Sequence, residues 1–242
     1  MNAARAPATG RASALLASAL LAGCATQAQT ERSVPDDPFV RSFRALKPAV
    51  VLFTMNVPSD DKRHKNAFDE AYGSGVAIAS GRCGTDIVTV EHVIHDAHKL
   101  RATLDDRRTV PAQVVGVDVK DDLALVHVQV PDRPVATLGS SAHAEAGMQI
   151  GVAGYPIPDA FADEHLGTRT SVYAGRVSSL RRDALELDLP VIPGESGGPV
   201  FDAGTGAVIG LAESRFDDEK AIGFGIPVED VKRFLHRFGR RR

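Results

Sequence analysis

The chain has 242 residues, with 28 basic and 31 acidic side chains, so its formal net charge is only −3. This near balance excludes the basic surface on which nucleic-acid binding depends. No run of 18 or more apolar residues occurs, which excludes an ordinary membrane-spanning helix. The length fits an export segment followed by one all-β domain or by two small domains.

Residues 1–23 have the features of a bacterial export signal, because two arginines precede a small, apolar run at 12–22. The segment ends in Leu-Ala-Gly-Cys, with the cysteine at position 24, and this end resembles the lipobox of bacterial lipoprotein precursors. The resemblance implies cleavage before Cys24 and acylation of that residue. The alternative is a plain secretory peptide in which Cys24 has no role.

Residues 24–38 are polar and without periodicity, so we interpret them as a tether between the lipid anchor and the folded domain. Asp37 and Pro38 then predict the cap and first turn of a short amphipathic helix. With Cys24 acylated, Cys83 is the one remaining cysteine, and an internal disulfide is excluded. We expect Cys83 to be buried and inert rather than to join two copies of the chain.

From residue 49 onward the pattern becomes that of short strands separated by turn residues. The first group of predicted strands is Ala49–Met55, Gly75–Ala79, Asp86–Val90, Leu100–Leu104, Gln113–Val117 and Leu123–Val128. The second group is Gln149–Ala153, Thr170–Val177, Leu185–Leu189, Pro199–Phe201, Ala207–Ala212 and Ile222–Ile226. Residues 56–72 are charged and are expected to form an exposed loop. Two groups of six strands, split near 131–146 without long helices, predict an all-β antiparallel fold.

Residues 228–242 are predicted to form a basic, amphipathic C-terminal helix. Val231, Phe234, Leu235 and Phe238 lie on one face, and lysine and arginine occupy the others. We expect the apolar face to pack on a barrel; contact with an anionic membrane surface is the alternative.

The segment Gly194-Glu195-Ser196-Gly197-Gly198-Pro199 is the most informative in the chain. A serine becomes a nucleophile when a base takes its proton and amide donors hold the oxyanion, and flanking glycines allow the tight turn this needs. The predicted donors are the N–H groups of Gly194 and Ser196. The G-x-S-x-G pattern also occurs in α/β-hydrolases, but there a helix follows the serine, and Gly197-Gly198-Pro199 forbids one.

The base is therefore expected upstream of the serine. His92 follows an apolar strand, and Asp122 begins another, with Asp121 as its competitor for the same role. The order histidine, aspartate, serine is that of the chymotrypsin-like arrangement. A zinc site at Glu91 to His95 is not expected, because the glutamate precedes the first histidine and the two histidines are three residues apart.

Seven strings of the sequence resemble the HtrA/Deg-type serine proteases. They are, in that family's order, LKPAVVLF (46–53), GSGVAIAS (73–80), TVEHVIHDA (89–97), DLALVHV (122–128), SVYAGRVSSL (171–180), PGESGGPV (193–200) and IGFGIP (222–227). The resemblance implies a trypsin-like domain at 39–227, built as a chymotrypsin-like double six-stranded antiparallel β-barrel. It also implies His92, Asp122 and Ser196 as the triad that passes a proton and forms an acyl-enzyme.

By the same resemblance, three segments would line the primary specificity pocket. Its expected residues are Val191, Ile192, Pro193, Leu211, Ala212, Glu213, Phe224 and Gly225. Mostly apolar walls favour a small or medium aliphatic residue before the scissile bond.

The sequence departs from the family pattern in three ways. Glu195 precedes the nucleophile where the family usually has asparagine, and Glu91 precedes the histidine where asparagine is frequent. Only residues 228–242 follow the protease domain, so the PDZ domain common in this family is not expected.

We therefore expect a serine endopeptidase of the cell envelope that acts on unfolded or extended polypeptides. No cofactor or metal is implied, and trimerisation, which many relatives show, is left undecided. The alternative is a catalytically weak or inactive polypeptide-binding (holdase) module on the same scaffold, because Glu195 places a carboxyl group beside the oxyanion hole.

Cys24→Ser tests the lipobox. The full chain produced in a bacterium should incorporate labelled fatty acid and sediment with membranes, whereas Cys24→Ser should do neither, because the thiol that carries the lipid is gone. Cys83→Ser is the matched control and should behave as the parent. Labelled, membrane-bound Cys24→Ser would contradict the lipobox assignment.

Overall fold

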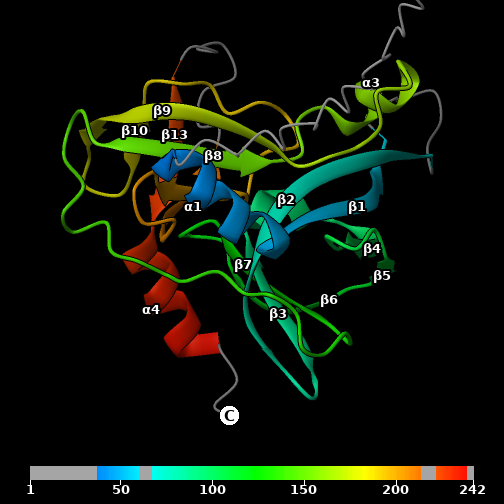
Figure 1. Ribbon diagram of the computed structural model, residues 1–242. Helices are drawn as coiled ribbons and strands as arrows, with labels where there is room; N and C mark the ends of the chain where they lie inside the picture. Colours follow the sequence, from blue (N-terminus) through cyan, green and yellow to red (C-terminus); the bar gives the residue numbers. More distant parts are fainter. Residues whose placement is uncertain (1–36, 60–66, 214–221, 239–242) are drawn as a thin grey trace, which may run out of the picture. The chain divides into compact units, whose positions relative to one another are not determined.

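The computed structural model describes residues 37–59, 67–213 and 222–238, which form two antiparallel sheets (Figure 1). The strands of the first sheet are β1 (Val50–Pro58), β2 (Phe68–Gly81), β3 (Gly84–Thr89), β4 (His98–Thr103), β5 (Thr109–Pro111), β6 (Gln113–Asp118) and β7 (Leu123–Val128). Those of the second are β8 (Gln149–Gly154), β9 (Ser171–Leu180), β10 (Leu185–Leu187), β11 (Pro199–Asp202), β12 (Val208–Glu213) and β13 (Gly223–Pro227). The predicted signal segment, Cys24 and the last four residues lie outside the described part.

The first sheet has the order β5-β4-β1-β2-β3-β7-β6, and the second is a closed barrel in the order β10-β13-β12-β11-β8-β9. The all-β, chymotrypsin-like architecture is thus confirmed, and the second barrel has the six strands that were predicted. The first sheet differs, because it has seven strands and remains open. The additional strand, β5, is three residues long and was too short to give an alternating pattern.

The region between β1 and β2 corrects a second expectation. Residues 56–58 and 68–72 were predicted to be loop, but they extend the β1–β2 hairpin, with Asn56 opposite Glu70 and Pro58 opposite Phe68. Residues 60–66 lie outside the described part. Backbone hydrogen bonds between adjacent strands do not depend on the side chains. These residues are polar and face water, so they show no alternating apolar pattern from which the strands could be predicted.

The helices are α1 (Pro38–Leu46), a 3-10 turn η1 (Lys47–Ala49), α2 (Glu91–Ile94), α3 (Pro158–Asp163) and α4 (Val228–Phe238). The predicted start of α1 is confirmed, because the Asp37 carboxylate accepts the Phe39 N–H at 2.7 Å and Pro38 occupies the first turn. None of the helices in the described ranges is both long and apolar enough to cross a bilayer.

The two sheets pack against one another where β1 and β2 meet β8 (Figure 1). Helix α1 precedes β1 of the first sheet, yet its Phe39 stacks on Phe201 of the second, with ring centroids 5.7 Å apart. Phe53 of β1 and Phe201 of β11 are completely buried in the same apolar cluster. Burial of such aromatic side chains is a main stabilising term, and here it is shared between the sheets.

The C-terminal helix packs on the first sheet and on β12 and β13, as the apolar pattern predicted. Val231 and Phe234 are at most 1 % exposed, and Phe238 lies against Gly116 of β6. On the polar face, Arg237 pairs with Asp118 at the end of β6. Over the residues described, the helix is therefore part of the same folded unit as the two sheets.

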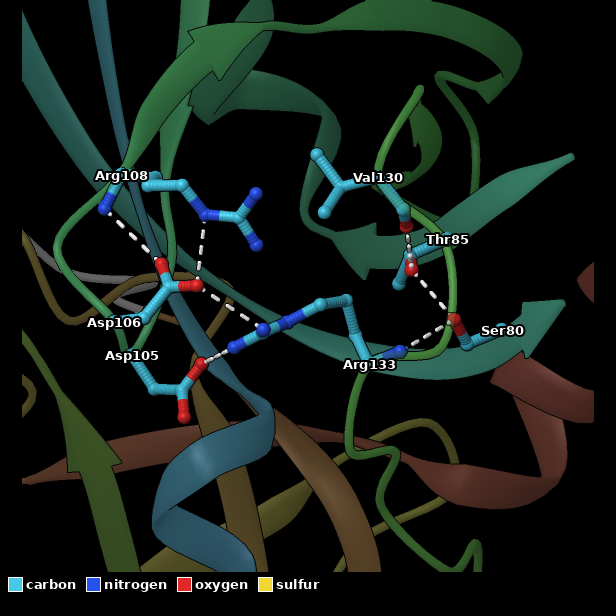
Figure 2. Close-up of polar contacts among 7 residues, drawn as sticks. All are labelled: Ser80, Thr85, Asp105, Asp106, Arg108, Val130 and Arg133. Carbon is cyan, nitrogen blue, oxygen red and sulfur yellow. Dashed lines mark hydrogen bonds and ion pairs between the residues drawn. The ribbon is translucent and has the colours of Figure 1, made fainter. Parts of the chain in front are cut away.

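The segment between the two sheets is fixed to the first sheet by Arg133 (Figure 2). Its guanidinium forms ion pairs with Asp105 and Asp106 in the β4–β5 turn. Its backbone N–H donates to Ser80 Oγ at 2.9 Å, and Ser80 in turn shares a 2.7 Å hydrogen bond with Thr85. Side chain and backbone of one residue thus hold the linker in place at two separate points.

A buried polar pair lies in the first sheet away from Asp122. His127 of β7 and Asp86 of β3 are each 5 % exposed, and His127 Nδ1 lies 2.6 Å from Asp86 Oδ1. The other ring nitrogen lies 3.2 Å from the carbonyl oxygen of Cys83. Contrary to expectation, Cys83 itself is exposed, because it occupies the β2–β3 turn rather than a strand.

His127→Ala should lower the free energy of unfolding by about 3 kcal/mol, because the buried Asp86 carboxylate loses its imidazole partner. Urea denaturation followed by circular dichroism measures the effect. The exposed His143 gives the matched control, and His143→Ala should change stability by less than about 0.5 kcal/mol. Equal effects of the two substitutions would show that the buried pair does not stabilise the fold.

Candidate active site

His92 and Asp122 come together because β3 and β7 are paired, with Thr89 opposite Ala124. His92 lies in α2, directly after β3, and Asp122 lies directly before β7. His92 Nδ1 is 2.7 Å from Asp122 Oδ2, and the His92 backbone N–H donates to Oδ1 at 2.9 Å. Asp121, the competing residue, instead donates its N–H to Asp118 and faces Arg237. The geometry therefore selects Asp122.

The charge environment of His92 favours its protonated form. Burial acts to lower the pKa of His92, but the hydrogen bond and charge of Asp122, with the charges of Glu213 and Glu91, raise it above its ordinary value. The imidazole side chain is 46 % exposed, so it is accessible to a substrate. An imidazole held by a carboxylate in this way can accept a proton and stabilise the resulting cation.

Ser196 lies in a tight loop that is fixed to β12. The Gly197 N–H donates to the Ala212 carbonyl, and the Ala212 N–H donates to the Gly198 carbonyl, both at 2.8 Å. Gly194 and Gly197 have φ angles of +94° and +84°, which only glycine adopts without strain. In addition, a methyl group at Gly197 would lie 2.1 Å from Thr89 Oγ1, so no larger residue fits.

Two backbone donors in this loop are available to a ligand. Within the described ranges, the N–H groups of Gly194 and Ser196 have no hydrogen-bond acceptor, whereas the Glu195 N–H between them donates to the Ile192 carbonyl at 2.9 Å. Unpaired backbone N–H groups on either side of a serine are what an oxyanion hole requires. The predicted donor positions thus remain free.

Ser74, in β2, connects this loop to the first sheet. Its hydroxyl donates to the Gly194 carbonyl at 2.7 Å and accepts the Tyr155 N–H at 3.0 Å. Its backbone N–H donates to the Ser196 carbonyl at 2.9 Å, and its own carbonyl accepts the Thr89 hydroxyl at 2.7 Å. Ser74 stands between two glycines in an apolar strand, a pattern that could have indicated its structural role, but that role was not predicted.

The sequence of this chain matches a known protein family. Residues 73–211, more than half of the chain, match the model of the trypsin-like peptidase domain. The chain belongs to this family. Among its relatives, Protease Do-like 1 from the chloroplast of Arabidopsis thaliana is 32 % identical over 210 residues, which cover 79 % of this chain and 45 % of the relative. A probable periplasmic DegP-like serine endoprotease of Pseudomonas fluorescens is 28 % identical over 218 residues, covering 84 % and 43 %.

Solved structures place this trypsin-like peptidase among the HtrA-type proteases. A serine endoprotease from Yersinia pestis is 26 % identical and superimposes with a TM-score of 0.68, covering 85 % of this chain and 68 % of that one. The HtrA-type protease AlgW with a tripeptide is 25 % identical, with a TM-score of 0.67, covering 84 % and 64 %. The chain spans less than half the length of the two relatives named above.

Ser196, the predicted nucleophile, lies in a loop that contacts the end of β3 just before His92. In the described part of the chain, no hydrogen bond joins Ser196 Oγ to His92. The loop of Ser196 approaches His92 where Gly197 lies against Thr89, three residues before His92. Such a contact is frequently long before substrate binds.

The predicted specificity residues lie on both sides of the nucleophile loop. Ala212 is paired with Gly225, and Glu213 with Phe224, across β12 and β13. Val191 lies against Gly223 at the start of β13. Ile192 and Pro193 lead into the loop itself, and the Pro193 carbonyl accepts the Ile157 N–H at 2.8 Å. Leu211 and Ala212 are both completely buried, so their side chains belong to the core.

The other acidic and histidine residues near the site have local partners. Glu91 Oε1 lies 2.8 Å from the Nδ1 of His95, which is exposed, and the ring of His98 packs edge-on against Phe68. Across the residues described, no group of three or more histidine, cysteine or acidic side chains could hold a metal ion. His95 and His98 therefore form local contacts.

Ser74→Ala should slow the reaction of Ser196 with a fluorophosphonate about tenfold, because the Gly194 carbonyl and Tyr155 N–H lose their partner and the loop loosens. The second-order labelling rate measures this. Ser80→Ala removes a hydroxyl from the same strand far along β2 and should leave the rate within twofold. Equal rates for parent and Ser74→Ala would contradict the positioning role.

Proposed function

We propose that this trypsin-like peptidase is a serine endopeptidase in which Ser196 is the nucleophile, His92 the general base and Asp122 its orienting partner. The observation that carries the proposal is the two-point contact between His92 and Asp122, beside a glycine-framed serine flanked by two unpaired N–H groups. The names of its relatives, serine proteases and endoproteases, point to the same chemistry.

The proposed reaction has two stages. Ser196 Oγ attacks the scissile carbonyl while His92 takes its proton, and the Gly194 and Ser196 N–H groups hold the oxyanion. His92 then gives that proton to the leaving amine, which departs as the acyl-enzyme forms. A water molecule then attacks the ester while the same imidazole takes its proton. The imidazole gives that proton to Ser196 Oγ as the acyl group leaves.

We propose that extended polypeptides are the substrates and that they add to the end of β12. Up to Ala212 both sides of this strand are paired, with β13 on one side and with β11 and the nucleophile loop on the other. The residue before the scissile bond would lie between 191–193 and 224–225, where apolar walls favour a small or medium aliphatic side chain.

The proposed location is the cell envelope, reached by the export signal at 1–23 and held there by lipid on Cys24. The periplasmic DegP-like relative supports export, because it matches most of this chain. Polypeptides and the membrane surface are then the partners of this protein.

Ser196→Ala should abolish labelling by a fluorophosphonate and reduce casein cleavage at least about a thousandfold, because the nucleophile is removed. His92→Ala should have a comparable effect. The exposed Ser178, in β9 of the same barrel, gives the matched control, and Ser178→Ala should retain full activity.

A folded parent protein that is neither labelled nor active on casein would overturn the endopeptidase assignment. Suppression of the aggregation of an unfolded client by that inactive protein, and equally by Ser196→Ala, would instead establish the holdase alternative.

A further inference from the structure

Glu195, between the two proposed oxyanion donors, is a completely buried carboxyl group. Its Oε2 accepts the Ile192 N–H at 2.9 Å, and its Oε1 has no hydrogen-bond partner within the described ranges. No cationic side chain of the described residues pairs with it. An ionised carboxylate in such a place is expensive, since a single N–H replaces its hydration shell.

The groups around Glu195 provide no positive charge that would balance an ionised carboxylate. The nearest backbone of β8 is at Gly154, where a methyl group would lie 3.0 Å from Glu195 Cα, and Ser74 of β2 reaches the same point. Neither residue titrates. From β9, Tyr173 faces the carboxyl; burial and then the charge of Glu195 raise the pKa of this tyrosine. Burial raises the pKa of Glu195 itself to about 7, and the Ile192 N–H opposes that rise.

The Glu195 side chain also closes a ring with Ile192. The Glu195 N–H donates to the Ile192 carbonyl, and the Ile192 N–H donates back to the Glu195 carboxyl group, both at 2.9 Å. Gly194 lies inside this ring with its φ of +94°. The carboxyl group thus fixes the turn that presents the Gly194 N–H. A neutral acid can do so with Oε2 as acceptor while Oε1 carries the proton.

We propose that Glu195 is a positioning residue that works as a neutral carboxylic acid, and that its ionisation weakens the oxyanion hole. The inference rests on the proposed endopeptidase function. A negative charge in this buried turn would oppose the negative charge that develops on the substrate oxygen, because both lie in a medium of low dielectric. Reactivity then requires a deprotonated His92 and a protonated Glu195 at the same time.

The pH profile of labelling by a fluorophosphonate, from pH 5 to 9, separates the two titrations. In the parent the rate should rise as His92 loses its proton, then fall as Glu195 ionises above a pH of about 7. Glu195→Gln keeps a neutral acceptor for the Ile192 N–H, so its profile should rise in the same way but lack the fall. At pH 8.5 it should react about tenfold faster than the parent.

Two further variants control the experiment. Glu145 is an exposed glutamate outside both sheets, and Glu145→Gln should show both limbs of the parent profile. Glu195→Ala leaves the Ile192 N–H without its acceptor and should be slower than Glu195→Gln at every pH. A falling limb in Glu195→Gln like that of the parent would show that ionisation of Glu195 does not cause the fall, and that outcome would overturn the proposal.

A stability measurement separates this inference from the proposed function. The native state binds the Glu195 proton more tightly than the unfolded chain does, so the parent should lose stability as pH rises from about 4.5 through 7. Glu195→Gln should therefore raise the midpoint of urea unfolding more at pH 8 than at pH 5. If neither protein reacts at any pH, the endopeptidase assignment fails. Independently of that result, an equal midpoint shift at both pH values overturns the assignment of Glu195 as a neutral acid.

Discussion

The site depends on one buried residue, Ser74, which makes three hydrogen bonds to the second sheet and its loops and one within the first sheet. Its hydroxyl and N–H hold the two carbonyls that flank Glu195, and its carbonyl holds Thr89 at the end of β3. His92 and Asp122 belong to the first sheet and Ser196, the proposed nucleophile, to the second, so their relative position has to be set by contacts of this kind. Each bond contributes about 1 kcal/mol, but together they fix an arrangement that packing alone would leave loose.

Asp122 organises the other half of the site by its backbone conformation. Its φ of +49° is unusual for a residue with a side chain, though aspartate tolerates it better than most. In this conformation its carbonyl accepts the Glu91 N–H while its carboxylate takes both the N–H and the ring of His92. A helix of four residues is unstable alone. Asp122 therefore holds α2 together and orients the imidazole with the same contacts.

The sequence predicted those parts of the fold that have strong local patterns. The apolar runs of β7 and β8, the cap at Asp37 and the C-terminal helix all follow from spacing along the chain. The order of His92, Asp122 and Ser196, with the glycines around the serine, was enough to predict the dyad and the loop. Such local patterns could not predict that the second sheet closes into a barrel while the first sheet stays open, because both depend on pairing between distant strands.

The features that sequence reasoning missed are of the same non-local kind. The polar end of the β1–β2 hairpin pairs through its backbone, and the turn that exposes Cys83 is set by the register of β2 with β3. The bonds of Ser74 reach about 80 and 120 residues along the chain. The burial of Glu195 likewise follows from β8 passing close to the nucleophile loop, which no property of the hexapeptide indicates.

An open sheet such as the first one has two edges, and they differ in the described structure. At one edge β5 is only three residues long and ends in Pro111, which cannot donate a hydrogen bond. At the other, α4 lies against β6, with Phe238 over Gly116. The β5 edge therefore offers a neighbouring molecule little bare backbone on which to add a strand, which disfavours edge-to-edge aggregation of crowded copies there.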